Sequence, residues 1–195
     1  MLNTFFEVYY LICFILGSFI RVWYSRKYKQ DRKAILREEG LAYALLASLW
    51  GVAILLPVVY MFTGWPSFAD YGSPSWAGWF GVAIFTMALW LLWRSHTDLG
   101  QNWRLTTELR EDHTLNTDGI FQYIRHPMYS AHWLWGIAQV LLIQNWIAGL
   151  ASLVIFIPIY MLRVRREEHM MLEQFGEEYR IYMSHTGRIF PHISK

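Results

Sequence analysis

Residues 128–162 read MYSAHWLWGIAQVLLIQNWIAGLASLVIFIPIYML. Two apolar runs, residues 128–143 and 146–162, are separated only by Gln144 and Asn145, which is typical of a tight helical hairpin. Runs of 16 and 17 residues lie at the short end of what spans a membrane, since a spanning helix needs roughly 17–25 residues. We expect both arms to cross the membrane; a re-entrant hairpin that enters and leaves by one face is the alternative.

Three further apolar runs lie upstream, at residues 5–24, 41–62 and 76–93. The chain is 55% hydrophobic and only 16% charged, whereas soluble domains carry about 25% charged residues. These features predict an all-α, polytopic integral membrane protein with five transmembrane helices. No stretch is left over for a separate soluble domain, so we expect one membrane domain over residues 1–195.

The lysine and arginine residues predict the orientation of these spans. All 17 fall in three groups, with 7 in residues 21–37, 4 in residues 94–125 and 6 in residues 163–195. The connections at residues 63–75 and 144–145 contain no lysine or arginine. Because cytoplasmic loops are enriched in basic residues, we expect a multi-pass protein whose N-terminus is outside and whose C-terminus is cytoplasmic. The polar, reactive sequence is then cytoplasmic as well.

Several classes of function are disfavoured. A single cysteine, Cys13, excludes a disulfide framework and a Cys-rich zinc site. The spacings of His113, His126 and His132 match no standard zinc pattern, so no metal is expected. A net charge of +2 without a basic stripe predicts no nucleic-acid partner. No strand is followed by a Gly-x-Gly-x-x-Gly motif, which argues against a membrane reductase.

Two local patterns stand out in the cytoplasmic sequence. Arg163 and Glu167 are four residues apart on one helix face, which fits either an interfacial salt bridge or a binding site. Pro127 suits the first position of a helix and leaves His126 at the cap, where the helix dipole favours a carboxylate or phosphate. Apolar residues at helical spacing then predict an amphipathic C-terminal helix: Met171, Leu172, Phe175, Tyr179, Tyr182 and Met183.

The sequence GIFQYIRHPMY at residues 119–129, followed by the tail 163–182, resembles the isoprenylcysteine carboxyl methyltransferase family. The tail contributes Glu167-Glu168 and FGEEY at residues 175–179. The resemblance extends over residues 112–191 and implies transfer of a methyl group from S-adenosyl-L-methionine to the carboxylate of a lipid-tailed, isoprenylcysteine-like acceptor. The products would be a methyl ester and S-adenosyl-L-homocysteine.

The resemblance also implies a cofactor-binding region at about residues 94–130 and 163–195. Arg163 and Glu167 take the places of the catalytic residues, and Arg163 that of the substrate-side arginine. Cofactor contacts carried over by position are His113, Thr114, Leu115, Asn116, Phe121, His126, Pro127, Met128, Tyr129 and Glu167. Two alternatives stay open: a phospholipid head-group N-methyltransferase, which needs a base to deprotonate the amine, and a non-enzymatic membrane scaffold.

Overall fold

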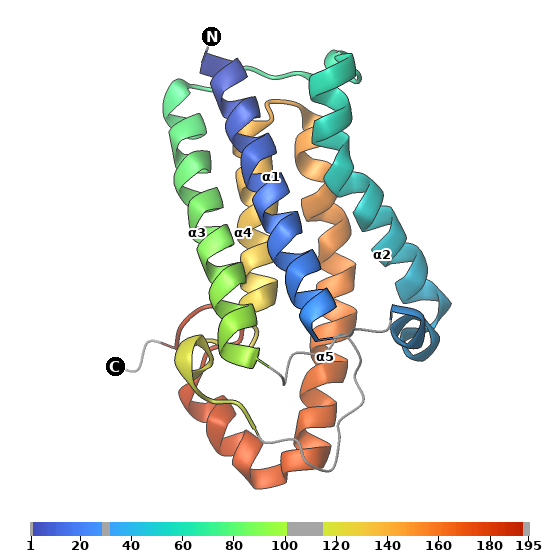
Figure 1. Cartoon of the computed structure of the whole chain (residues 1–195), viewed down its shortest axis with the longest axis vertical. Coiled ribbons are helices and arrows are strands. Elements are labelled where there is room, and N and C mark those ends of the chain that lie inside the picture. Colours follow the sequence, from blue (N-terminus) through green and yellow to red (C-terminus); the bar gives the residue numbers. More distant parts are fainter. Residues whose placement is uncertain (1, 29–31, 101–114, 193–195) are drawn as a thin grey trace.

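The computed structural model describes residues 2–28, 32–100 and 115–192, and the regular structure of this part of the chain is all helical (Figure 1). Its elements follow in the order α1 Leu2–Lys27, α2 Arg32–Thr63, η1 Ser67–Ala69, α3 Ser75–Leu99, η3 Gly119–Gln122, α4 Pro127–Leu142 and α5 Trp146–His185, where η marks a short 3-10 helix. The predicted all-α class is therefore confirmed.

Each of the five predicted apolar runs lies in one of the helices α1 to α5, with only Ile143, the C-cap of α4, left outside. Among the described residues, four helices are long and apolar enough to cross a membrane: α1, α2, α3 and α5. Helix α4 has 16 residues, just below the usual length of a span. The predicted hairpin is present, with its turn at Ile143 to Asn145.

The helices extend past the apolar runs. α1 continues to Lys27 and α2 already begins at Arg32, although residues 25–40 read as a polar linker. Arginine, lysine, leucine and glutamate are all good helix formers, so the helix does not end where the apolar sequence does. An apolar run therefore marks only part of a helix, and not its ends.

Helix packing places α4 at the centre of the bundle, against α3 and α5, while α1 packs on α3 and α2 on α5. Small residues allow close approach: a side chain at Gly81 would collide with Leu142, and one at Gly136 with Leu153. Such small residues are common between membrane helices, where tight packing replaces the hydrophobic effect. Tyr10 is fully buried in this core.

The two ends of the bundle differ in character. The N-terminus, the α2–α3 connection and the α4–α5 turn lie together at one end, and the residues before α4 lie at the other (Figure 1). At the first end, the fully buried Asn145 accepts hydrogen bonds from the amides of Ile147 and Ala148 and so caps α5. Its amide group donates to the Pro66 carbonyl and to Asp70, at 2.7 Å each.

The far end of α5 reaches beyond the bundle, turns, and comes back beneath α3 and α4 (Figure 1). The turn is at Gly176, whose φ of +51° is readily adopted only by glycine. The returning part is helical, as the amphipathic pattern predicted, and buries Tyr179 and Tyr182. This turn brings the C-terminal residues next to the start of α4.

Candidate active site

The loop that leads into α4 is held by the end of α3. A carboxylate oxygen of Asp98 accepts from the backbone amide of Ile120 at 2.8 Å, and the Asp98 carbonyl accepts from the Asn116 amide group at 2.8 Å. Gly119 adopts φ +60°, and a side chain there would meet the Asp98 carboxylate at 2.3 Å. The loop thus fits closely against Asp98, and η3 is fixed at this position.

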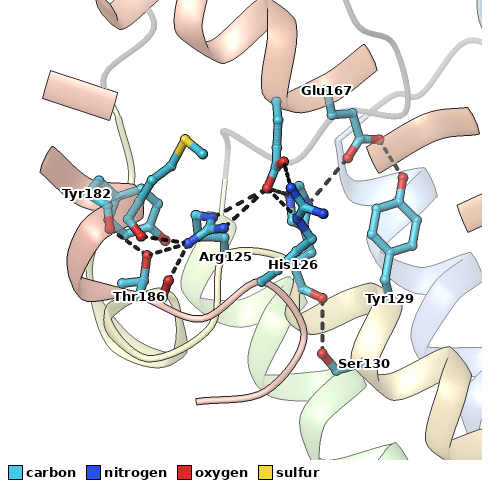
Figure 2. Close-up of polar contacts among 10 residues, drawn as sticks. Arg125, His126, Tyr129, Ser130, Glu167, Tyr182 and Thr186 are labelled. Atoms are coloured by element: carbon cyan, nitrogen blue, oxygen red, sulfur yellow. Dashed lines mark hydrogen bonds and ion pairs between the residues drawn. The ribbon is translucent and has the colours of Figure 1, made fainter. Parts of the chain in front are cut away.

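The start of α4 has the geometry that the sequence predicted. His126 is the N-cap residue and Pro127 occupies the first helical position. Proline costs nothing there because the amide it lacks would have no partner within the helix. The side chains of His126 and Tyr129 both extend toward Glu167 on α5 (Figure 2).

Glu167 is the meeting point of three side chains. One carboxylate oxygen, Oε1, accepts from the Tyr129 hydroxyl at 2.6 Å and from the Arg163 guanidinium at 3.1 Å. The other, Oε2, lies 3.6 Å from Nδ1 of His126. The Glu167 side chain is still 25% exposed, so its carboxylate is accessible to a ligand.

Arg163 is held from a second side by α2. It donates to the Tyr43 hydroxyl at 3.0 Å, and its guanidinium carbon lies 5.3 Å from the centre of the Tyr43 ring. The planar guanidinium is therefore fixed between a ring and a carboxylate, an arrangement that lysine cannot reproduce. Tyr43 is 120 residues away in sequence, and no sequence motif pointed to it.

A second carboxylate, Glu168, is buried beside the first, at 6% exposure. It lies 2.5 Å from the Arg188 guanidinium, 3.4 Å from that of Arg125 and 3.4 Å from Nε2 of His126. Burial opposes the charged form, but the hydrogen bonds from His126 and Arg188 and their charges lower the pKa of Glu168 to about 2. Glu168 is therefore ionised, and the guanidinium groups of Arg125 and Arg188 and the His126 ring surround it.

The residues that follow α5 lie across the start of α4, and we call residues 186–190 the C-terminal strap. The Gly187 and Arg188 carbonyls accept from the amides of Arg125 and His126, at 2.8 and 2.9 Å. The Ile189 carbonyl accepts from the Ser130 hydroxyl at 2.6 Å. The Arg125 guanidinium also donates to the carbonyls of Met183 and Thr186. The strap is thus part of the site.

The structure brings together four of the predicted site residues: His126, Tyr129, Arg163 and Glu167. Pro127 is buried and Met128 half-buried beside them. His113 and Thr114 lie outside the described residues.

The remaining predicted contacts support the loop. Leu115 is half-buried, and the Asn116 side chain bonds Asp98 and the Asp118 amide. Phe121 is buried, and its carbonyl accepts from the Tyr182 hydroxyl at 2.6 Å. Arg125, Glu168 and Arg188 were not predicted as site residues, although the first two belong to the motifs that carried the resemblance.

An aromatic wall runs from Glu167 into the apolar part of the bundle. The Tyr129 ring lies 5.6 Å from Tyr160 and 6.2 Å from Phe156, measured between ring centres. The His132 ring centre lies 5.6 Å from that of Phe156, and the Trp50 ring centre, on α2, lies 5.3 Å from that of His132. These five side chains form a continuous aromatic cluster beside the polar site, in which Phe156 and Tyr160 are buried.

His132 serves as a neutral ring in this wall. Its Nδ1 donates to the Met128 carbonyl at 2.6 Å, so its Nε2 is the acceptor for the Arg21 guanidinium at 2.9 Å. Both nitrogens are engaged, which leaves none to act as a base. Among residues 2–28, 32–100 and 115–192, no group of three or more His, Cys, Asp or Glu side chains is placed to hold a metal ion.

Comparison with known proteins assigns this site to a class. Residues 79–173 match the isoprenylcysteine carboxyl methyltransferase family. A solved structure of the eukaryotic intramembrane Ras methyltransferase of that family aligns with 78% of this chain and 53% of its own, at a TM-score of 0.52 and 22% identity. That likeness shows a shared fold.

Curated relatives agree with the family match. Protein-S-isoprenylcysteine O-methyltransferase B of Arabidopsis thaliana is 24% identical over 79% of both chains. The enzyme of Dictyostelium discoideum is 30% identical, over 58% of this chain and 46% of its own length. The human enzyme is also 30% identical, over 44% of this chain and 30% of its own length. The chain thus spans less than half the length of the latter two relatives.

The apolar helices and the family match therefore indicate a multi-pass membrane protein that is similar to the methyltransferases of this family. The likeness to the isoprenylcysteine carboxyl methyltransferase family extends over residues 79–173, just under half of the chain. The matched region contains His126, Tyr129, Arg163 and Glu167, the four side chains that the structure brings together.

Proposed function

We propose that this protein transfers a methyl group from S-adenosyl-L-methionine to the carboxylate of a lipid-tailed, isoprenylcysteine-like acceptor at the membrane surface. The observation that carries the proposal is the position of Arg163. Its guanidinium lies between Glu167, at the polar end of the aromatic wall, and Tyr43. Such a site suits an acceptor with a charged head and an apolar tail.

The residues around Glu167 fit the methyl donor. The accessible Glu167 carboxylate can accept hydrogen bonds from the ammonium or ribose hydroxyl groups of the donor, and Tyr129 and His126 hold that carboxylate in place. The start of α4 is suited to the donor carboxylate by its dipole. When bound, S-adenosyl-L-methionine supplies a sulfonium methyl group that is open to attack by a nucleophile.

Arg163 positions the acceptor. A carboxylate is already ionised at neutral pH, so its oxygen forms the new bond to the methyl carbon without a base, and the carbon–sulfur bond breaks in the same step. Charge-assisted bonds from a guanidinium are among the strongest a protein offers to a carboxylate. Catalysis then consists mainly of holding the two reactants in line.

The aromatic wall is the proposed place for the acceptor tail. Tyr129 and Phe156 continue from the polar site into the apolar part of the bundle, so a tail can lie in the membrane while the head reaches Arg163. An amine acceptor would require a base, and His132, the histidine in this wall, has both nitrogens engaged. The Arg163 guanidinium favours a carboxylate over a phospholipid amine, whose methylation would need Glu167 or His126 as the base.

We further propose that α4 crosses the membrane with the other four helices, that residues 94–130 and 163–195 form the cytoplasmic cofactor-binding region of a single domain, and that the N-terminus lies outside. Cys13 is the only cysteine in the chain, so a Cys13→Ser background accepts single reporters. A cysteine at Gly72 should react with an impermeant reagent only from outside, and one at Thr117 only from inside. The opposite labelling would overturn the orientation.

The test of function is transfer of labelled methyl groups by protein in lipid vesicles. We expect a synthetic S-isoprenylcysteine with a free carboxylate to be methylated, while its carboxamide and phosphatidylethanolamine are not. Methylation of phosphatidylethanolamine instead would establish the amine reaction. Absence of transfer to every acceptor by folded protein would support a scaffold.

A further inference from the structure

The C-terminal strap is joined to the start of α4 mainly through its backbone. Gly187 and Arg188 accept from the amides of Arg125 and His126, and the Gly187 amide donates to the Tyr123 carbonyl at 3.2 Å. A side chain at Gly187 would lie 1.6 Å from the Phe190 carbonyl oxygen. The strap therefore has one tight conformation, and a methyl group at residue 187 would displace it.

Glu168 connects this strap to the helices. Its partners come from three places: Arg125 before α4, His126 at the α4 cap, and Arg188 in the strap. The Glu168 and Arg125 side chains are both only 8% exposed. A buried carboxylate with two guanidinium partners and the His126 ring links these segments, because removing its charge leaves the two guanidinium groups without their carboxylate.

His126 connects Glu168 to Glu167. Nδ1 of the imidazole ring lies 3.6 Å from the Glu167 carboxylate (Figure 2). Nε2 of the same ring lies 3.4 Å from the Glu168 carboxylate. The ring orientation that favours one contact thus sets the other. A change in the position of Glu168 would therefore alter the contact between His126 and Glu167.

We propose that Glu168 is a positioning residue for the methyl-donor site, acting through His126 on Glu167 and through Arg188 on the C-terminal strap. Glu168 itself is buried and fully engaged, so it does not contact the donor. The inference rests on the proposed function for the identity of the ligand at Glu167. It adds to that function a buried charge centre and the strap as parts of the donor site.

The central experiment is calorimetric titration of S-adenosyl-L-homocysteine into detergent-purified wild type and Glu168→Gln. Glutamine keeps the shape and removes the charge. We expect about a tenfold or greater loss of affinity, since His126 would lose its contact with the Glu168 charge and would no longer hold Glu167 in place. The KM for the acceptor should change by less than about twofold, because Arg163 and Tyr43 are not among the contacts of Glu168.

The matched control is Glu177→Gln. Glu177 is paired with Arg180 at 3.7 Å, but the two side chains are 76% and 71% exposed, and exposed pairs contribute little. This variant should bind S-adenosyl-L-homocysteine as the wild type does. Glu168→Asp, which keeps the charge on a shorter side chain, should recover part of the lost affinity.

Two variants on the strap keep the test valid where Glu168→Gln fails to fold. Arg188→Gln removes one partner of Glu168, and Gly187→Ala displaces the strap without changing any charge. Both should weaken S-adenosyl-L-homocysteine binding, and both should speed hydrogen exchange at the amides of Arg125 and His126, which the strap carbonyls protect in the wild type.

The outcomes distinguish the positioning role of Glu168 from the proposed methyltransferase function. Faster amide exchange together with weaker binding supports the positioning role. Faster exchange with unchanged binding overturns it and leaves the strap as structural only. Wild-type protein that is folded but does not bind S-adenosyl-L-homocysteine overturns the proposed function and this inference with it, whereas wild-type binding that Glu168→Gln retains overturns the inference alone.

Discussion

The Arg163 guanidinium lies 3.1 Å from Oε1 of Glu167, one helical turn further along α5. At this spacing the two side chains share one helix face, and the pair is only 13% and 25% exposed. The same oxygen of Glu167 receives the Tyr129 hydroxyl from α4. One surface of α5 thus presents a fixed cation next to a fixed carboxylate, each suited to a different reactant.

Arg163→Lys should lower kcat/KM for the acceptor by about tenfold or more, because an ammonium group cannot bond Tyr43 and a carboxylate in one plane. Binding of S-adenosyl-L-homocysteine should change much less. Arg165→Lys, at an exposed position two residues further on, is the control and should be neutral. Steady-state kinetics of methyl transfer measure this change in kcat/KM. A wild-type rate in Arg163→Ala would contradict the role of Arg163.

Tyr129→Phe removes the hydroxyl that bonds Glu167 at 2.6 Å and leaves the aromatic wall in place. Loss of a hydrogen bond to a charged group costs about 1.5–3 kcal/mol, so S-adenosyl-L-homocysteine should bind about tenfold or more weakly. Tyr123→Phe changes a tyrosine that is 55% exposed and should have no effect. Equal affinities of the two variants would show that Tyr129 does not orient Glu167.

Acid should weaken the contribution of Glu168 to stability in a defined range. Its pKa is about 2 in the folded protein, below the ordinary value of 4.5, so its stabilising effect is complete above pH 4.5 and is lost as the pH falls toward 2. The difference in melting temperature between wild type and Glu168→Gln should therefore shrink as the pH falls below 4.5. A difference that persists unchanged to pH 3 would contradict this account.

Asp98→Ala should weaken S-adenosyl-L-homocysteine binding, since the Asp98 carboxylate accepts from Ile120 at 2.8 Å and fixes the loop that leads to His126. Asp98→Asn keeps an acceptor oxygen for the Ile120 amide, although it loses the ion pair with Arg94. Its affinity should fall between those of Asp98→Ala and the wild type. Titration calorimetry gives the order, and a weaker Asp98→Asn would contradict the prediction.

Asn145→Ala tests the opposite end of the bundle. It removes the cap of α5 and the bonds to Pro66 and Asp70, and a lost cap costs about 1–2 kcal/mol. We expect a lower melting temperature with unchanged S-adenosyl-L-homocysteine affinity in the protein that remains folded. Reduced affinity would show that the two ends of the bundle are coupled.

Much of the fold could be predicted from the sequence because the membrane requires long apolar helices. The positions of all five helices, the hairpin turn at Gln144 and Asn145, and the cap at His126 are confirmed. The helix ends were not predicted, since the polar residues 25–27, 32–40, 94–99 and 163–185 continue the helices beyond the apolar runs. The orientation and the crossing of α4 stay predictions.

The site was predicted only where its residues are close in sequence. The Arg163–Glu167 pair follows from a spacing of four. Tyr43 and Arg188 reach the site through tertiary packing, by α2 against α5 and by the turn at Gly176. Asn116 was expected to contact the cofactor because of its position along the chain. Its side chain instead bonds the Asp98 carbonyl and the Asp118 amide within the loop, and no sequence pattern indicates these contacts.

The most direct measurement is the calorimetric titration of S-adenosyl-L-homocysteine into detergent-purified wild type and Glu167→Ala. Glu167 contacts Tyr129, Arg163 and His126, and its side chain is half-buried at the site. The account predicts micromolar binding by the wild type that is lost in Glu167→Ala. A folded wild type that binds no S-adenosyl-L-homocysteine, or a Glu167→Ala variant that binds it equally well, would contradict it.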